Sequence, residues 1–190
     1  MLDLFLRELR PLARNAKLPC IRRATARDIE SVTGILREAA RWLDRTARPM
    51  WRDNELIPAR LAQEIRAGLF IIAECQGEGA GTLKLQLQDL LFWPDISQEN
   101  SLFVHRLAVR RRYAGAGVSL ALLNWAAQHA RSLDRSYLRL DCEASRAKLR
   151  AFYERFGFRH HSDRQVGPYF VSRYEYDLAP PPAPSIAAET

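Results

Sequence analysis

The apolar positions along the chain alternate between strand-like and helix-like patterns. Short apolar or alternating runs predict strands at residues 20–24, 69–75, 81–87, 101–109, 137–142, 158–161 and 169–178. Apolar residues spaced three and four positions apart predict four helices, at about residues 28–43, 54–68, 118–131 and 146–156. Helices interleaved with strands in this way predict an α/β domain with a mixed central sheet of about six to seven strands.

Cap and turn residues support these elements. Thr25 or Asp28 is a suitable N-cap for the first helix, Asn54 for the second, and Gly68 marks the end of the second helix. Gly-Glu-Gly at residues 77–79 predicts a turn that joins two strands into a hairpin.

The two ends of the chain differ from this domain. Leucine and phenylalanine recur at helical spacing within residues 1–10, which predicts a short amphipathic helix limited by Pro11. Residues 179–190 are rich in proline and alanine, which is typical of an extended or disordered tail. We therefore divide the chain into an N-terminal extension (1–18), one domain (19–178) and a tail (179–190).

Charge and cysteine content narrow the function classes only slightly. The 190 residues include 29 Lys and Arg against 22 Asp and Glu, a net charge of +7 that suits a polyanionic ligand. Three separated cysteines without a CxxC pair favour neither a zinc site nor a disulfide framework, and they fit a reduced, cytoplasmic protein. No apolar run is long enough to cross a membrane, and charges interrupt the N-terminal leucines, as they do not in a secretory signal.

The most informative chemistry lies in residues 107–125. A short apolar strand is followed by three arginines, a small-residue turn at residues 114–117, and a helix that begins at about Val118. The first N–H groups of a helix lack internal partners, and the helix dipole favours an anion there. Small residues let a phosphate approach the main chain, and Arg111 or Arg112 would add charge, so the segment predicts a phosphate site.

The wider sequence resembles a known superfamily. The turn RRRYAGAGVS, the helix LALLNWAAQHAR, the strand YLRLDC and the segment KLRAFYERFGF together resemble the GNAT superfamily of acyl-CoA-dependent N-acyltransferases, over about residues 20–178. The resemblance implies a sheet splayed between its fourth and fifth strands. It also implies acetyl-CoA as the donor and a primary amine of a small molecule or protein as the acceptor, acetylated by direct attack.

The phosphate turn departs from the pattern Arg/Gln-x-x-Gly-x-Gly/Ala of the family. Alignment through the helix LALL puts Ala114 at the Arg/Gln position, Gly117 at the first glycine and Ser119 at the last small position. A shifted alignment from Arg112 through Gly115 restores the literal motif but starts the helix too early, so we prefer the first. The resemblance then implies these acetyl-CoA contacts: Leu107, Ala108, Val109, Arg112, Ala114, Gly115, Ala116, Gly117, Val118, Ser119 and Lys148.

The resemblance also implies catalytic roles. Tyr153 stands at the usual position of the tyrosine that protonates the leaving thiolate, and the N–H of Val109 would polarise the thioester carbonyl. The glutamate that often serves as the base is absent from the strand SLFVHRLAV. His105 shares side-chain parity with Phe103 and Leu107 in a regular strand, which predicts it as the base.

The acceptor site is expected around the first two helices and the loop before the fourth strand. Tryptophans near carboxylates there suit an ammonium group. The expected acceptor contacts are Trp42, Trp51, Trp93 and Asp141, with Asp44, Asp53, Asp89 and Asp95 close to the tryptophans in the sequence. Asp141, at a strand end, is also the alternative base.

Two other functions stay open. The departure at Ala114 and the missing glutamate fit a CoA-binding sensor without catalysis. The net positive charge fits acetylation of aminoacyl-tRNA, although no basic and aromatic interleaving along a strand favours nucleic acid as a partner. An exposed sheet edge or the N-terminal helix would provide a surface for a homodimer.

Overall fold

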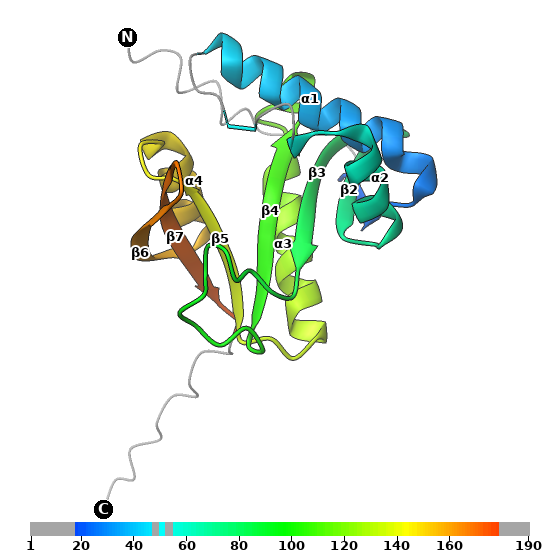
Figure 1. The fold of residues 1–190 in the computed structure, drawn as a ribbon. Helices are drawn as coiled ribbons and strands as arrows, with labels where there is room; N and C mark the ends of the chain where they lie inside the picture. Colours follow the sequence, from blue (N-terminus) through cyan, green and yellow to red (C-terminus); the bar gives the residue numbers. More distant parts are fainter. Residues whose placement is uncertain (1–17, 47–49, 52–54, 179–190) are drawn as a thin grey trace, which may run out of the picture.

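A seven-stranded sheet organises the computed structural model, which describes residues 18–46, 50–51 and 55–178 (Figure 1). The strand order is β1-β2-β3-β4-β5-β7-β6, and β4 and β5 form the parallel pair. The strands are β1 (Cys20–Arg23), β2 (Phe70–Cys75), β3 (Glu78–Gln86), β4 (Ser101–Val109), β5 (Tyr137–Glu143), β6 (Arg159–Val166) and β7 (Tyr169–Asp177). This confirms the predicted mixed α/β sheet.

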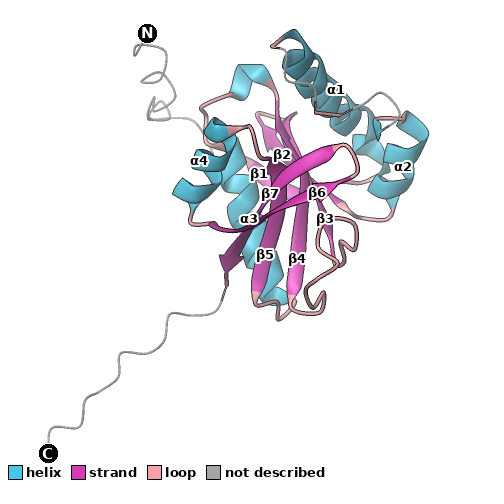
Figure 2. Ribbon diagram, turned by 60° about the vertical axis from the view of Figure 1, so that its left-hand side comes forward, coloured by secondary structure: helices cyan, strands magenta, loops and turns pink. Residues whose placement is uncertain are grey.

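Helices cover both faces of the sheet (Figure 2). On one face α1 (Ile29–Arg45) and α2 (Pro58–Arg66) bury apolar stripes over β2, β3 and β4. On the other face α3 (Val118–Ser132) and α4 (Ala147–Phe156) pack on a larger apolar cluster. Four helices of these lengths, each burying one stripe, agree with the predicted apolar spacing.

The start of α1 follows the predicted caps, whereas the start of α2 does not. Thr25 and Asp28 form a reciprocal capping box around a short 3₁₀ turn (Ala26–Asp28) that leads into α1. The second helix begins at Pro58, later than predicted, because proline suits the first helical position, where no N–H is needed. Asn54, the predicted cap, lies outside the described residues.

The strand β6 is longer than the sequence predicts. It runs over Arg159–Val166, whereas the apolar pattern ends at His161. The missed residues are polar because β6 is an outer strand of the sheet, and its side chains are mostly exposed.

The two terminal predictions lie outside the described residues. These are the amphipathic helix within residues 1–10 and the tail at residues 179–190. Among the described helices, none combines the length and apolar character that crossing a membrane requires.

The parallel strands β4 and β5 separate halfway along their length. They pair only from Ser101 opposite Tyr137 to Val104 opposite Leu140. Beyond that point β4 stays with β3 and β5 stays with β7, so the two halves of the sheet diverge (Figure 1). This confirms the predicted splay, and it leaves His105 and Asp141 as the first residues past the last pair.

Candidate functional site

A β-bulge reshapes β4 at the splay. His105 lies opposite Lys84 and Ala108 lies opposite Thr82, so two residues of β4 face Leu83 alone. Arg106, one of the two, has a left-handed backbone with φ of 52°. The extra residue reverses the side-chain alternation, so Leu107 packs toward the cluster under α3. The expectation that His105 and Leu107 share parity is therefore wrong, because a regular strand was assumed.

The main chain of β4 is open toward the splay. The N–H of Arg110 donates to the carbonyl of Ala80 at 2.9 Å, while Val109 lies opposite Gly81. Antiparallel ladders bond alternate residues to one neighbour. The N–H and C=O of Val109 therefore point away from β3, to the side from which β5 has diverged. An extended ligand can pair with them there, as an added strand would.

The turn between β4 and α3 has the geometry of an anion site. Gly115 and Gly117 adopt φ of 78° and 75°, which only glycine adopts without strain, and Gly117 is the N-cap of α3. No side chain caps the helix, so the amides of Val118 and Ser119 face outward at its positive end. The helix begins immediately after Gly117, where the preferred alignment places the first glycine.

The three arginines before this turn are held by α1 and β3. Arg110 donates to Glu38 at 2.9 Å and to the carbonyl of Gly79 at 2.9 Å. The guanidinium of Arg111 lies 4.1 Å from the ring centre of Trp42. Arg112 forms an exposed ion pair with Glu78. Exposed pairs contribute little stability, so Arg112 is the guanidinium that a phosphate group can most readily recruit.

The predicted tryptophan and lysine contacts differ in how far they are exposed. Trp42 is half-buried beneath Arg111, and Trp51 is half-buried against the core under α1. Lys148 is exposed in the first turn of α4. Trp93 is fully buried, so it offers no surface to a substrate, contrary to the sequence-based expectation. Large aromatic residues in loops close the core as readily as they line sites.

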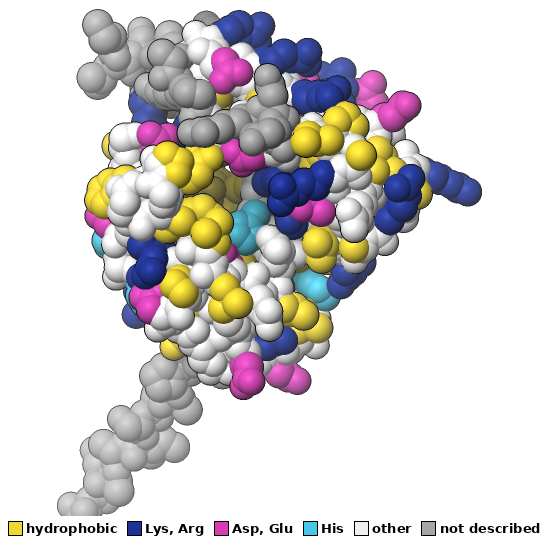
Figure 3. Space-filling view, viewed as in Figure 1, with side chains coloured by type: hydrophobic (Ala, Val, Ile, Leu, Met, Phe, Trp, Pro, Cys, Tyr) yellow, Lys and Arg dark blue, Asp and Glu magenta, His cyan; other side chains and the backbone are white. Residues whose placement is uncertain are grey.

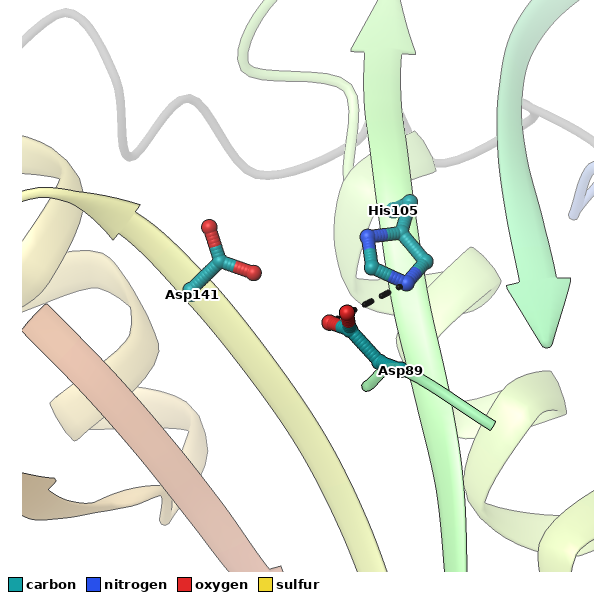
Figure 4. Close-up of side chains that lie close together, drawn as sticks. All are labelled: Asp89, His105 and Asp141. Atoms are coloured by element: carbon teal, nitrogen blue, oxygen red, sulfur yellow. Dashed lines mark ion pairs between the residues drawn. The ribbon is translucent and has the colours of Figure 1, made fainter. Parts of the chain in front are cut away.

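Three titratable side chains meet at the splay (Figure 4). Asp89 comes from the loop between β3 and β4, His105 from β4 and Asp141 from β5. One ring nitrogen of His105 and one carboxylate oxygen of each aspartate all lie within 4.8 Å of one another. The Nε2 of His105 is 3.7 Å from the Oδ2 of Asp89. Within the described part of the chain, neither of these two atoms has a hydrogen-bond partner. On the molecular surface a hollow with a histidine at its side opens on this face (Figure 3).

Burial and neighbouring charges shift the pKa values of Asp141 and His105 in opposite directions. Burial and the nearby charge of Asp89 raise the pKa of Asp141 to about 7. Burial, with Lys84 and Arg106 nearby, lowers the pKa of His105 to about 4, so its imidazole is neutral at pH 7. A carboxyl that titrates near neutral pH is well matched to general base catalysis.

The same three side chains carry the donor atoms that metal ions use, but their spacing is wide for one ion. Two ligands of a tetrahedral zinc ion lie about 3.4 Å apart, whereas these donor atoms span up to 4.8 Å. The arrangement suits proton transfer better than tight metal coordination.

Tyr153 lies on the α4 side of the splay. It is buried among aromatic rings, with Phe158 at 5.8 Å and Tyr174 at 6.2 Å between ring centroids. Burial, with Cys142 and Asp141 nearby, raises the pKa of Tyr153 above its ordinary value. The phenol therefore keeps its proton and can donate it only to a strong base formed beside it. The ordinary pKa of tyrosine is close to that of a thiol, but the pKa of this buried phenol is higher.

Cys142 cannot easily serve as a nucleophile. It is buried on β5, and burial with the adjacent charge of Asp141 raises its pKa to about 12. The thiolate is the reactive form of cysteine, and this site disfavours it.

Sequence reasoning did not distinguish Asp89 from the other loop aspartates. No local pattern marks it, because its partners come from β4 and β5, which are distant in the chain. The short apolar run that contains His105 predicted its strand but not the bulge beside it.

Comparisons with known proteins agree with this geometry. The model of the Acetyltransferase (GNAT) family matches residues 36–158. The uncharacterized N-acetyltransferase YesJ of Bacillus subtilis (strain 168) is 31% identical over 143 residues, which cover 71% of this chain and 78% of YesJ.

Solved structures share the fold. An acetyltransferase of the GNAT family from Listeria monocytogenes 4b F2365 superposes with a TM-score of 0.70 at 22% identity, covering 83% of this chain and 94% of its own. The putative acetyltransferase yncA of Salmonella typhimurium, solved with acetyl-CoA, has a TM-score of 0.64 at 19% identity. The match covers 90% of this chain and 99% of the yncA chain. With the splayed sheet and the family match over most of the domain, the chain belongs to the GNAT family of acetyltransferases.

Proposed function

We propose that this protein transfers the acetyl group of acetyl-CoA to a primary amine of a small molecule or protein, by direct attack of the amine on the thioester. The observation that carries the proposal is the junction at the splay. There the open main chain of β4 and the start of α3 suit the donor, and the cluster of Asp89, His105 and Asp141 suits the proton of an acceptor amine. The complex of yncA with acetyl-CoA supports the choice of donor.

The donor is assigned to the β4 side of the splay. Its pyrophosphate would accept hydrogen bonds from the amides of residues 117–119, next to the small side chains of residues 114–116. The amides of its pantetheine arm would pair with the main chain of residues 107–109. Arg112 and Lys148 would contact the phosphates of the nucleotide end.

The acceptor is assigned to the cluster. An ammonium group must lose one proton before its nitrogen attacks the thioester carbon. Asp141, the alternative base from the sequence, takes that proton, and the neutral imidazole of His105 accepts a hydrogen bond from the amine. His105 thus keeps a place at the reacting amine, although burial makes it a weaker base than the sequence alone indicates.

Acetyl transfer proceeds here without a covalent enzyme intermediate. The N–C bond forms while the N–H of Val109 stabilises the negative oxygen of the tetrahedral intermediate. The C–S bond then breaks, Tyr153 gives its proton to the thiolate, and the second proton of the amine nitrogen returns to the phenol. The first proton leaves Asp141 for solvent. The high pKa of Cys142 argues against an acetyl-cysteine route.

A reduced, cytoplasmic location belongs to the same proposal. The three cysteines are free, and a reducing compartment keeps thiols in that state. The described sheet has two outer strands, β1 and β6, and either edge would offer a surface to a second copy of the chain in a homodimer.

An acidic residue at the start of α3 should weaken acetyl-CoA binding without harming the fold. In Ser119→Asp the new carboxylate lies in the first turn, where it favours the helix but repels a pyrophosphate. We expect the Kd for acetyl-CoA, measured by calorimetry, to rise at least ~10-fold while the Tm stays equal or rises. Asn124→Asp, which adds the same charge on an exposed position of α3, should change the Kd less than ~2-fold. Equal effects of the two variants would remove the phosphate site from the start of α3.

The proposed activity is tested with acetyl-CoA and a panel of amines. Propylamine, spermidine, lysine and a peptide with a free N-terminus are each incubated with acetyl-CoA; released thiol is measured with a thiol reagent and products by mass spectrometry. Acetylation of any of these amines supports the proposal. Tight acetyl-CoA binding with no acetylated amine would favour the sensor, and RNA binding that weakens steeply with salt would favour aminoacyl-tRNA as the acceptor.

A further inference from the structure

The loop between β3 and β4 is built to hold one carboxylate inside the splay. The side chain of Asp89 is only 6% exposed. Its Oδ1 accepts the N–H of Phe92 at 3.0 Å, while its Oδ2 faces His105. The backbone N–H of Asp89 donates to the Oε1 of Gln98 at 2.7 Å, and the amide of Gln98 donates to the carbonyl of Trp93. This network fixes the direction in which the carboxylate points.

The buried tryptophan anchors the same loop. The guanidinium groups of Arg139 and Arg173 lie 5.5 and 4.8 Å from the ring centre of Trp93. Arg173 also donates to the carbonyl of Phe92 at 3.1 Å and forms a two-point ion pair with Asp95, at 2.5 and 2.9 Å. The loop is therefore tied to β5 and β7, the far half of the splayed sheet.

The two carboxylates of the cluster have different surroundings. Burial raises the pKa of Asp89, but the backbone N–H bonds that it accepts and the nearby charge of Lys84 oppose this rise. Asp141 faces Arg173, its neighbour on β7, but that guanidinium is already paired with Asp95. Two close carboxylates in unequal surroundings share one proton unequally, so Asp89 holds the charge and Asp141 holds the proton.

The other charged and titratable groups near Asp141 do not change this unequal sharing of the proton between Asp89 and Asp141. His105 on β4 is neutral at pH 7, because burial and nearby cations lower its pKa. The thiol of Cys142 and the phenol of Tyr153 are also neutral, because burial raises the pKa of each. The charge of Asp89 is thus the unpaired negative charge nearest to Asp141 within the described cluster.

We infer that Asp89 is a positioning residue that acts through Asp141, and that its fixed charge adapts the site to amines that arrive as aliphatic ammonium ions. A more strongly basic Asp141 helps only when the substrate amine arrives protonated and must lose that proton before it attacks. An arylamine, which is uncharged at neutral pH, gains nothing from it. This inference rests on the proposed acetyltransferase function, and it adds a substrate class and a further residue to it.

The test measures the proton affinity of Asp141 directly and needs no acceptor. In the full chain labelled with ¹³C at aspartate carboxyl carbons, NMR titration should show a carboxyl with a pKa near 7 that is missing from Asp141→Asn. In Asp89→Asn, whose amide oxygen can still accept the N–H of Phe92, the proton affinity of Asp141 should fall at least ~10-fold. Asp134→Asn, a remote and exposed change of the same charge, should leave the titration unchanged.

Kinetics supply a second readout that a purely structural role would not change. With Asp89→Asn, the acid limb of kcat/KM for propylamine should move about one pH unit lower, and the ratio of propylamine to aniline acetylation should fall about 10-fold. An Asp141 that titrates like an ordinary carboxyl, or that is unchanged by Asp89→Asn, would overturn the inference. If the protein instead fails to bind acetyl-CoA, the proposed function fails while the titration result stands.

Discussion

Replacing Tyr153 with phenylalanine should lower kcat by about 100-fold or more and leave the Kd for acetyl-CoA nearly unchanged. The substitution removes only the phenolic oxygen, and no side-chain hydrogen bond of Tyr153 is found within the described residues, so no structural contact is lost with it. Without the phenol, the thiolate must leave as an anion in an apolar site, which is costly. Steady-state kinetics and calorimetry of acetyl-CoA binding measure the two effects separately.

The fold should tolerate this change. A buried hydroxyl without a strong partner contributes little stability, so the Tm of Tyr153→Phe should equal or exceed that of the wild type. Tyr176→Phe removes a phenol from the same aromatic cluster, near Phe156, and should change kcat less than ~2-fold. Unchanged turnover in Tyr153→Phe would remove this tyrosine from the mechanism.

Replacing Asp141 with asparagine should make the protein more stable at pH 8 and nearly inactive. The unfolded chain ionises this carboxyl near pH 4, whereas the folded protein keeps it protonated to about pH 7. Folding is therefore progressively disfavoured as the pH rises from about 4 to 7. Above that range the charge costs up to about 4 kcal/mol, which asparagine avoids.

Urea unfolding at pH 4, 6 and 8 measures this effect. The variant and the wild type should have similar free energies of unfolding at pH 4 and should diverge toward pH 8. At the same time kcat/KM for the best amine should fall by about 100-fold. Equal stability at pH 8 would show that Asp141 ionises freely in the folded protein. Full activity would show that another group takes the proton.

Local signals predicted most of the fold. The apolar spacing of α1 and α3, the glycines before α3 and the strand of residues 101–109 were all visible because each depends on neighbours in the sequence. Polar β6 was predicted too short because an exposed outer strand needs no apolar face. The delayed start of α2 reflects the proline at its first position, which the apolar spacing did not weigh.

The site was predicted only in part. Tyr153, His105 and Asp141 were identified as candidates, but the sequence could not show that the last two stand beside Asp89. Trp93 was expected at the acceptor, whereas it is buried between Arg139 and Arg173 and anchors the loop that presents Asp89. Burial also reversed the expected order of base strength, raising the pKa of Asp141 and lowering that of His105.

The sequence by itself determined the order of the elements, the phosphate turn and the family resemblance, because these depend on residues within a few positions of one another. The tertiary structure alone decided where β4 and β5 part, that a bulge turns the side chains past His105, and that two carboxylates from different segments share one buried space. Proton affinity depends on burial and on charges a few ångströms away, and these distances are set by the folded sheet rather than by sequence spacing.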